Sequence, residues 1–121
     1  MAAFEAYKEM NFYKLSIDLV DLTYKLTGQF PKEEKYGLID QMRRASASVP
    51  SNIAEGAGRD TKKQLFQFLS IAKGSLCELD TQYDIANRQG FVPDDKLPIA
   101  KDLITQISKT MYGFRKWLSN E

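Results

Sequence analysis

Apolar residues recur every three or four positions along four stretches of the chain, and this spacing predicts four amphipathic helices. The predicted helices cover approximately residues 11–28, 34–57, 61–89 and 95–119. The third, residues 61–89, carries an apolar stripe from Leu65 to Ala86 and is about 40 Å long in all at 1.5 Å per residue. No strand pattern competes, which predicts an all-α fold. In the first helix the expected core stripe is Phe12, Leu15, Leu19, Leu22 and Leu26.

Short connections between long helices favour an antiparallel, up-down-up-down four-helix bundle. The chain has 121 residues, near the usual size of one domain, so we expect residues 1–121 to form a single bundle domain. The first ten residues or so fall outside the helical pattern. They are expected to fray or to wrap a neighbouring molecule.

Pro50 lies in the middle of the second predicted helix. There it removes the hydrogen bond to the carbonyl of Ser46, which costs roughly 3 kcal/mol. Two interpretations remain open. In the first, Pro50 makes a structural kink, and the hydroxyls of Ser46, Ser48 or Ser51 satisfy the freed carbonyls. In the second, the bend shapes an interface with another subunit.

Two surfaces outside the core stripes indicate self-association. On the second helix, the face opposite the core carries only small side chains, which let another backbone approach closely. On the first helix, Tyr13, Ile17, Val20 and Tyr24 form a second apolar stripe, although the tyrosines could instead lie flat at the bundle edge. The candidate interface residues are Tyr13, Ile17, Tyr24, Ala47, Ser51, Asn52, Ala54, Glu55 and Gly58.

Three segments resemble those of a known family. The segment 41–59, QMRRASASVPSNIAEGAGR, carries the main likeness, and FPKEE at 30–34 and FLSIAKGSLCEL at 68–79 extend it over nearly the whole chain. They resemble the 23S rRNA intervening-sequence proteins, a bacterial family of four-helix bundles. The resemblance implies assembly into homopentamers and points to a role around nucleic acid. It also directs attention to Asn52, Glu55, Gly56 and Arg59, which match characteristic positions of the family motif.

The net charge limits how the chain can bind nucleic acid. It has 17 lysines and arginines against 16 aspartates and glutamates, a net charge of +1, so binding needs a local basic patch. The best candidate is the turn before the third helix, where backbone amides at the helix N-terminus favour phosphate and Asp60 is the expected N-cap. Two further arginines lie on the second helix. The candidate nucleic-acid-binding residues are Arg43, Arg44, Arg59, Lys62 and Lys63.

A second basic cluster lies near the end of the fourth predicted helix, where Arg115 and Lys116 precede Trp117. An aromatic ring beside basic side chains can stack on a nucleic-acid base. Trp117 is nevertheless expected to lie in the core or in a subunit interface.

Catalysis has little support in the sequence. The chain has no histidine, which removes the commonest general base and the Glu-x-x-His ligands of di-iron bundles. Its one cysteine, Cys77, lies between Leu76 and Leu79 and is expected to be buried. Gly56 and Gly58 do not make a phosphate-binding loop. We therefore expect no enzymatic activity and no bound metal or cofactor.

The chain is expected to be cytoplasmic, with no membrane contact. It has no recognisable signal peptide, no apolar stretch of the roughly 20 residues that span a bilayer, and no second cysteine for an intramolecular disulfide. The expected partners are further copies of the chain, in a homopentamer, and RNA or DNA. In the alternative, the protein is an interaction scaffold that binds a partner protein and no nucleic acid.

Overall fold

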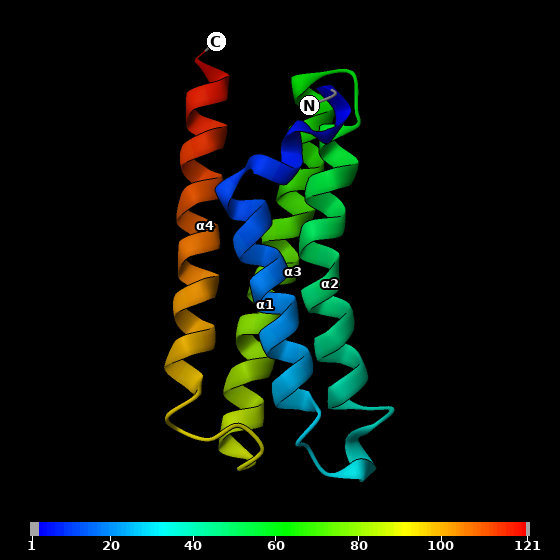
Figure 1. The fold of residues 1–121 in the computed structure, drawn as a ribbon, viewed down its shortest axis with the longest axis vertical. Coiled ribbons are helices and arrows are strands. Elements are labelled where there is room, and N and C mark those ends of the chain that lie inside the picture. Colours follow the sequence, from blue (N-terminus) through cyan, green and yellow to red (C-terminus); the bar gives the residue numbers. More distant parts are fainter. Residues whose placement is uncertain (1–2, 121) are drawn as a thin grey trace.

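The computed structural model describes residues 3–120, and every regular element in that range is helical. A 3₁₀ helix, η1 (Ala3–Glu9), precedes α1 (Asn11–Thr27), and a short 3₁₀ turn, η2 (Lys32–Glu34), precedes α2 (Leu38–Ala57). Two longer helices follow, α3 (Lys62–Arg88) and α4 (Leu97–Ser119) (Figure 1). These elements confirm the predicted all-α fold with four α-helices.

Neighbouring helices run antiparallel, which makes the bundle an up-down-up-down one (Figure 1). Each helix packs against the next along the chain, and α1 also packs against α4, which closes the bundle. α1 is therefore diagonally opposite α3, and the α1–α2 side is opposite the α3–α4 side. The closest packing is between α2 and α3, and the least close is between α3 and α4.

In the last three helices the buried apolar residues recur every three or four positions, as the helical periodicity predicts. At the lower end of Figure 1, Phe30 and Phe91 from the two loops pack with ring centroids 5.4 Å apart and, with buried Val92, close the core. The buried apolar residues of α2, α3 and α4 are Met42, Ala45, Val49, Ile53, Leu69, Ala72, Leu76, Leu79, Tyr83, Ala86, Ala100, Ile104, Ile107 and Met111.

α1 departs from its predicted stripe because it turns hydroxyl groups into the core. Ser16, Thr23 and Thr27 are fully buried, whereas the expected leucines at 15, 22 and 26 are only half-buried. The Ser16 hydroxyl donates to the Tyr13 carbonyl at 2.6 Å, and the Thr27 hydroxyl donates to the Thr23 carbonyl at 2.7 Å. These bonds within the helix remove the cost of burying an unpaired hydroxyl.

The third buried hydroxyl of α1 bonds across the bundle. Thr23 and Tyr83 of α3 are fully buried, and their hydroxyl oxygens are 2.7 Å apart. Because α1 and α3 are diagonally opposite, this hydrogen bond crosses the middle of the core. Burial raises the pKa of Tyr83 to about 12, and the hydrogen bond to Thr23 offsets only part of that rise.

α2 begins later than the expected start near residue 34. Lys32–Glu34 form the turn η2 instead, and the helix proper begins at Leu38. The Glu34 carboxylate accepts a hydrogen bond from the Leu38 backbone N–H at 3.3 Å, which satisfies one of the amides left free at a helix start. The chain between Pro31 and Gly37 is therefore a connection that contains a 3₁₀ turn and supplies a capping carboxylate to the start of α2.

The N-terminal segment is more ordered than its sequence indicates. η1 packs against both α1 and α2, and the ring of Tyr7 meets the ring of Tyr13 edge-on, with centroids 5.2 Å apart. In the single chain, Ala3–Glu9 thus folds back onto its own bundle, where the sequence predicts fraying or contact with a neighbour.

α2 continues through Pro50, whose side chain is buried. The Ser46 hydroxyl donates to the carbonyl of Arg43 at 2.9 Å, and the Ser48 hydroxyl bonds to Ser75 of α3 at 2.8 Å. These two hydroxyls are thus engaged away from the Ser46 carbonyl that the proline frees, which removes Ser46 and Ser48 from the first interpretation but not Ser51.

Gly56 sets how closely α2 and α3 approach at the upper end of the bundle. It is buried, and a β-carbon there would lie 2.9 Å from the Phe68 β-carbon and 3.2 Å from the Leu65 carbonyl oxygen. Both atoms belong to α3 and are part of its backbone or attached directly to it, so neither can swing away. Any larger residue at this position must push the two helices apart.

Gly56→Ala is expected to lower the free energy of unfolding by about 1–3 kcal/mol, because overpacking outweighs the better helix propensity of alanine. The matched control is Gly74→Ala on α3, where a β-carbon meets nothing within 4 Å. That control should gain up to about 1 kcal/mol. Urea unfolding measures both variants, and equal stabilisation of the two would contradict the close approach at Gly56.

Tyr83→Phe is expected to cost about 1 kcal/mol of unfolding free energy at neutral pH, because the buried Thr23 hydroxyl loses its partner. In the native protein Tyr83 has a pKa near 10 when the chain is unfolded and near 12 when it is folded. The neutral buried tyrosine therefore contributes its full stability below pH 10, and this contribution is lost as the pH rises through 12. This difference of about two pKa units corresponds to roughly 2–3 kcal/mol.

The measurement is the unfolding free energy of Tyr83→Phe and the native protein from pH 8 to about pH 12. The variant should lose less stability above pH 10, since phenylalanine cannot ionise. Tyr112→Phe, at an exposed tyrosine, is the control and should follow the native curve. Parallel curves for Tyr83→Phe and the native protein would count against a neutral, buried Tyr83.

Candidate nucleic-acid interface

The turn between α2 and α3 and the last turns of α4 lie at the same end of the bundle (Figure 1). The Lys62 ammonium at the start of α3 donates to the Leu118 carbonyl near the end of α4, at 3.0 Å. The two basic segments of the sequence therefore form one surface. We call this surface the basic end, and its members, all exposed, are Arg59, Lys62, Lys63, Arg115 and Lys116.

A hollow of about 430 Å³ lies within the basic end, lined by Lys62, Lys63, Phe66, Gln67, Ser70 and Arg115. Arg115 reaches across from α4 to α3. Its guanidinium lies over the Phe66 ring, 4.9 Å from the centroid, and donates to the Ser70 hydroxyl at 3.0 Å. These contacts position the guanidinium, so an anion in the hollow meets cations from two helices.

The start of α3 adds the positive end of a helix dipole to this surface. Thr61 is the N-cap, because its hydroxyl oxygen accepts a hydrogen bond from the Gln64 backbone N–H at 3.2 Å. The Gln64 side chain reaches back and accepts from the Asp60 backbone N–H at 3.3 Å. The expectation that Asp60 caps the helix is therefore wrong, and its carboxylate does not occupy the capping position.

Arg59 joins α2 to α3 at the edge of the basic end. Its guanidinium donates to the Glu55 carboxylate at 3.3 Å and lies over the Phe68 ring, 4.8 Å from the centroid. The side chain is still 43% exposed. Arg59 is therefore held in place and partly neutralised, and it adds less free positive charge than the two neighbouring lysines.

Trp117 is 58% exposed, so the expectation that it lies in the core is wrong. Its ring lies near that of Phe114 at the edge of the core, with centroids 6.1 Å apart. α4 extends beyond the start of α1, so its last turns lie beside α3 but have no helix on the α1 side (Figure 1). The indole thus stands beside Lys116 on the surface.

Arg43 and Arg44 lie apart from the basic end. They are on the first half of α2, and Arg43 is about 24 Å from Arg59 along the helix axis. Arg43 links α2 to α1. Its guanidinium donates to the Thr27 hydroxyl at 2.9 Å and lies over the Tyr24 ring, 4.5 Å from the centroid. Arg44 pairs with Asp40 on its own helix at 2.9 Å. The five arginines and lysines predicted from the sequence do not form one patch.

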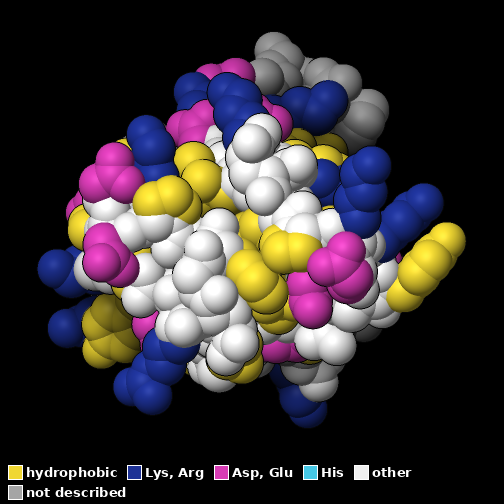
Figure 2. Space-filling view, turned by 90° about the horizontal axis from the view of Figure 1, so that it is seen from below, with side chains coloured by type: hydrophobic (Ala, Val, Ile, Leu, Met, Phe, Trp, Pro, Cys, Tyr) yellow, Lys and Arg dark blue, Asp and Glu magenta, His cyan; other side chains and the backbone are white. Residues whose placement is uncertain are grey.

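The opposite end of the bundle has mixed charge. Seen from below in Figure 2, lysine and arginine side chains alternate with aspartates and glutamates, and apolar side chains lie between them. The loop segments 32–36 and 93–96 contain both signs. The basic end also has acidic neighbours in Glu55 and Asp60, but its five cations outnumber these two.

Most of the predicted interface residues fall on the α1–α2 side. Ile17 and Tyr24 are 38% and 46% exposed, and Tyr13 is half-buried against Tyr7. The small residues of α2 beside them are half-buried or exposed: Ala47, Ser51, Ala54 and Gly58. Because α1 and α2 are antiparallel and Tyr24 meets Arg43, the aromatic and the small-residue stripes run alongside each other.

Asn52 and Glu55 belong to a different face of α2. The Asn52 amide donates to the Ser48 hydroxyl at 2.9 Å, and that hydroxyl in turn bonds to Ser75 of α3. Glu55 pairs with Arg59. These two predicted interface residues therefore turn towards α3.

Cys77 is exposed, so the expectation of a buried thiol is wrong. It lies on the flank of α3 that faces the loosely packed α4. Between residues 3 and 120, no group of three or more acidic or cysteine side chains is placed to hold a metal ion. None of the helices described is long and apolar enough to cross a membrane.

Comparison with known proteins identifies one family. A family model described as 23S rRNA-intervening sequence protein matches residues 8–113, which include α1, α2, α3 and most of α4. Arg115, Lys116 and Trp117 lie just beyond the matched range. A comparison with curated proteins finds no match.

Proposed function

The chain belongs to the 23S rRNA-intervening sequence protein family, and from this premise we propose that it is a cytoplasmic, non-enzymatic, RNA-binding bundle. In the proposal, copies of the chain assemble into a ring, a homopentamer, and each copy contacts RNA phosphates through its basic end. One observation carries the proposal: Lys62, Lys63 and Arg115 converge from two helices on a single hollow.

Electrostatics favour this surface over the rest of the molecule. A net charge of +1 supplies no general attraction for RNA, so affinity must come from local cations and the start of α3. One such patch binds weakly. Repeated around a ring, however, several patches engage one polyanion and gain effective concentration without any new contact. The proposal therefore needs both the basic end and the assembly.

The exposed Trp117 favours unpaired RNA over duplex. A base in a loop or a single strand can stack on an indole, whereas bases inside a helix are already stacked. Trp117 lies next to Lys116, so a nucleotide can contact an aromatic face and a cation together. Phosphate contacts alone do not separate RNA from DNA, and the experiment below includes both.

The ring is assigned to the α1–α2 side. Closed rings of more than two subunits use head-to-tail contacts between two different surfaces. Ile17 and Tyr24 of the aromatic stripe are exposed, and the small side chains of the α2 stripe allow the backbone of another subunit to approach closely. Covering both stripes also removes apolar area that Ile17 and Tyr24 expose in one copy.

Lys62→Gln combined with Lys63→Gln and Arg115→Gln is expected to weaken the binding of single-stranded RNA about tenfold or more at physiological salt. Each lost phosphate contact should also flatten the plot of log affinity against log salt, by about 0.7–0.9 per contact. Fluorescence anisotropy with labelled single-stranded RNA, hairpin RNA and duplex DNA at several salt concentrations measures both effects.

The matched control removes three exposed lysines at the other end of the bundle, with Lys25→Gln, Lys32→Gln and Lys35→Gln. It changes the net charge equally and should bind RNA with nearly native affinity. Equal losses in the two triple variants would show that only net charge matters and would contradict the assignment to the basic end. No binding by the native protein even at low salt would favour a scaffold that binds proteins alone.

Ala54→Glu is expected to break the ring, because it places a charge and a long side chain where another backbone approaches. Light scattering coupled to size-exclusion chromatography should show a lower mass than for the native protein. The control is Gly113→Glu at an exposed position of α4, where an added β-carbon meets nothing within 4 Å. This variant should keep the native mass. A native mass for Ala54→Glu would defeat the assignment to the small-residue stripe.

A further inference from the structure

The side of the bundle between α3 and α4 carries an open groove. These two helices are the least closely packed neighbours. Two adjoining cavities lie between them, of about 240 and 460 Å³, and the same three residues line both: Lys73, Ser108 and Lys109. Because the cavities share these residues, they form one continuous groove along the helices. We call it the α3–α4 groove.

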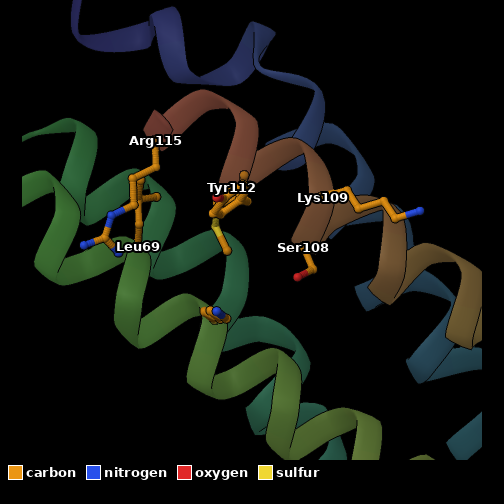
Figure 3. Close-up of a pocket in the computed structure, with 7 residues that line it drawn as sticks. Leu69, Ser108, Lys109, Tyr112 and Arg115 are labelled. Atoms are coloured by element: carbon orange, nitrogen blue, oxygen red, sulfur yellow. The ribbon is translucent and has the colours of Figure 1, made fainter. Parts of the chain in front are cut away.

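Apolar side chains form the floor of the α3–α4 groove. Core residues of both helices reach it, namely Leu69, Leu76, Ile104 and Met111. Tyr112 lines the upper of the two cavities, below Arg115 on α4, and is 66% exposed (Figure 3). The four floor residues are themselves at most 8% exposed, so Tyr112 is the large apolar side chain of the groove that stands in water and that a second helix can cover.

Cations line the upper part of this groove. Lys73 stands on α3, and Lys109 and Arg115 stand on α4. In Figure 3, Arg115 reaches over Leu69 and the Lys109 chain extends outward from the rim, whereas the Ser108 hydroxyl points into the gap. A helix lying in the groove would therefore have basic side chains along both of its edges.

The acidic residues at the lower end of the groove are already paired. Asp80 and Asp84 of α3 each accept from the Lys101 ammonium of α4 at 2.8 Å. Partial burial of Lys101 opposes its charge, but its hydrogen bonds to Asp80 and Asp84 raise its pKa above the usual value. This cluster ties the helices together and leaves Lys73, Lys109 and Arg115 to set the charge of the rim.

We infer that the α3–α4 groove docks an amphipathic helix of a partner protein, one with an apolar stripe and acidic residues beside it. The groove follows α3 from Leu69 to Thr81, a length of about 18 Å, which matches about 12 residues of helix. Side chains at i, i+3, i+4 and i+7 cover the floor. Glutamates or aspartates on the flanks meet Lys73, Lys109 and Arg115.

Charge and shape together favour this occupant over the two other ligands considered. RNA phosphates suit the cations but leave the apolar floor uncovered, because bases offer no stripe of that shape. A second copy of the chain is assigned to the α1–α2 side, which lies on the opposite side of the bundle. An acidic amphipathic helix satisfies the floor and the rim at once.

The test uses labelled synthetic peptides of about 18 residues and the full-length protein, with fluorescence anisotropy as the readout. One peptide has a leucine stripe at helical spacing with flanking glutamates. A second has lysines in place of the glutamates, and a third has the first composition in an order that breaks the stripe. The first should bind saturably, and the other two should bind about tenfold more weakly or worse.

A charge-reversal variant, Lys73→Glu with Lys109→Glu, should weaken the glutamate peptide at least about tenfold and strengthen the lysine peptide. Both positions are exposed, and neither belongs to the basic end. The control, Lys25→Glu with Lys35→Glu, makes the same change of charge elsewhere and should bind the glutamate peptide as the native protein does. Circular dichroism melting confirms that both variants fold.

Three results would overturn the inference. The first is no saturable binding of the glutamate peptide, or equal binding of all three peptides. The second is a Lys73→Glu, Lys109→Glu variant that has lost the native oligomeric mass, since the groove would then belong to a second copy. The third is a Lys73→Glu, Lys109→Glu variant that binds the glutamate peptide with native affinity but binds RNA more weakly than the Lys25→Glu, Lys35→Glu control does. That result would assign the groove to nucleic acid.

Discussion

The close approach of α2 and α3 is the constraint on which the other features depend. Gly56 permits it, since a β-carbon there would lie within 3 Å of the Phe68 β-carbon. This contact lies just before the α2–α3 turn and so helps to fix where Arg59 and Lys62 point. On the other flank of α3, the packing against α4 is the loosest in the bundle. The tight contact and the open groove are therefore opposite flanks of one helix.

Helical periodicity predicted the bundle well because burial of an apolar stripe is what holds each helix in place. Where it failed, on α1, the reason is chemical. Periodicity assigns the inward positions to leucine, but Ser16 and Thr27 satisfy their hydroxyls on their own helix, and Thr23 bonds to Tyr83. A small hydroxyl with an internal partner fits the interior as well as a leucine and allows closer packing. Sequence spacing does not register that partner, which for Thr23 lies 60 residues away.

The candidate site was predictable in part. The sequence marked Lys62 and Lys63 at a helix start and Arg115 near a helix end, and an antiparallel bundle must bring those two ends together. Their convergence on one hollow could therefore have been inferred from topology. The contacts that remove Arg43 from the site could not, because they depend on the rotation of α1 that brings Thr27 and Tyr24 against α2. The exposure of Cys77 and Trp117 likewise follows from helix separation and helix length, which apolar spacing does not report.

The three proposed surfaces lie on different parts of one bundle, and only Arg115 is common to two of them. It lines the hollow of the basic end and also the upper part of the α3–α4 groove. Its guanidinium rests on Phe66 and Ser70, between the two sites. A phosphate in the hollow and a carboxylate in the groove would draw on the same cation, so each ligand should lower the affinity for the other by the same factor. The α1–α2 side shares no residue with either site, so the ring interface is not itself a part of this competition. Assembly is still linked to RNA binding, because several patches on one ring engage the same polyanion.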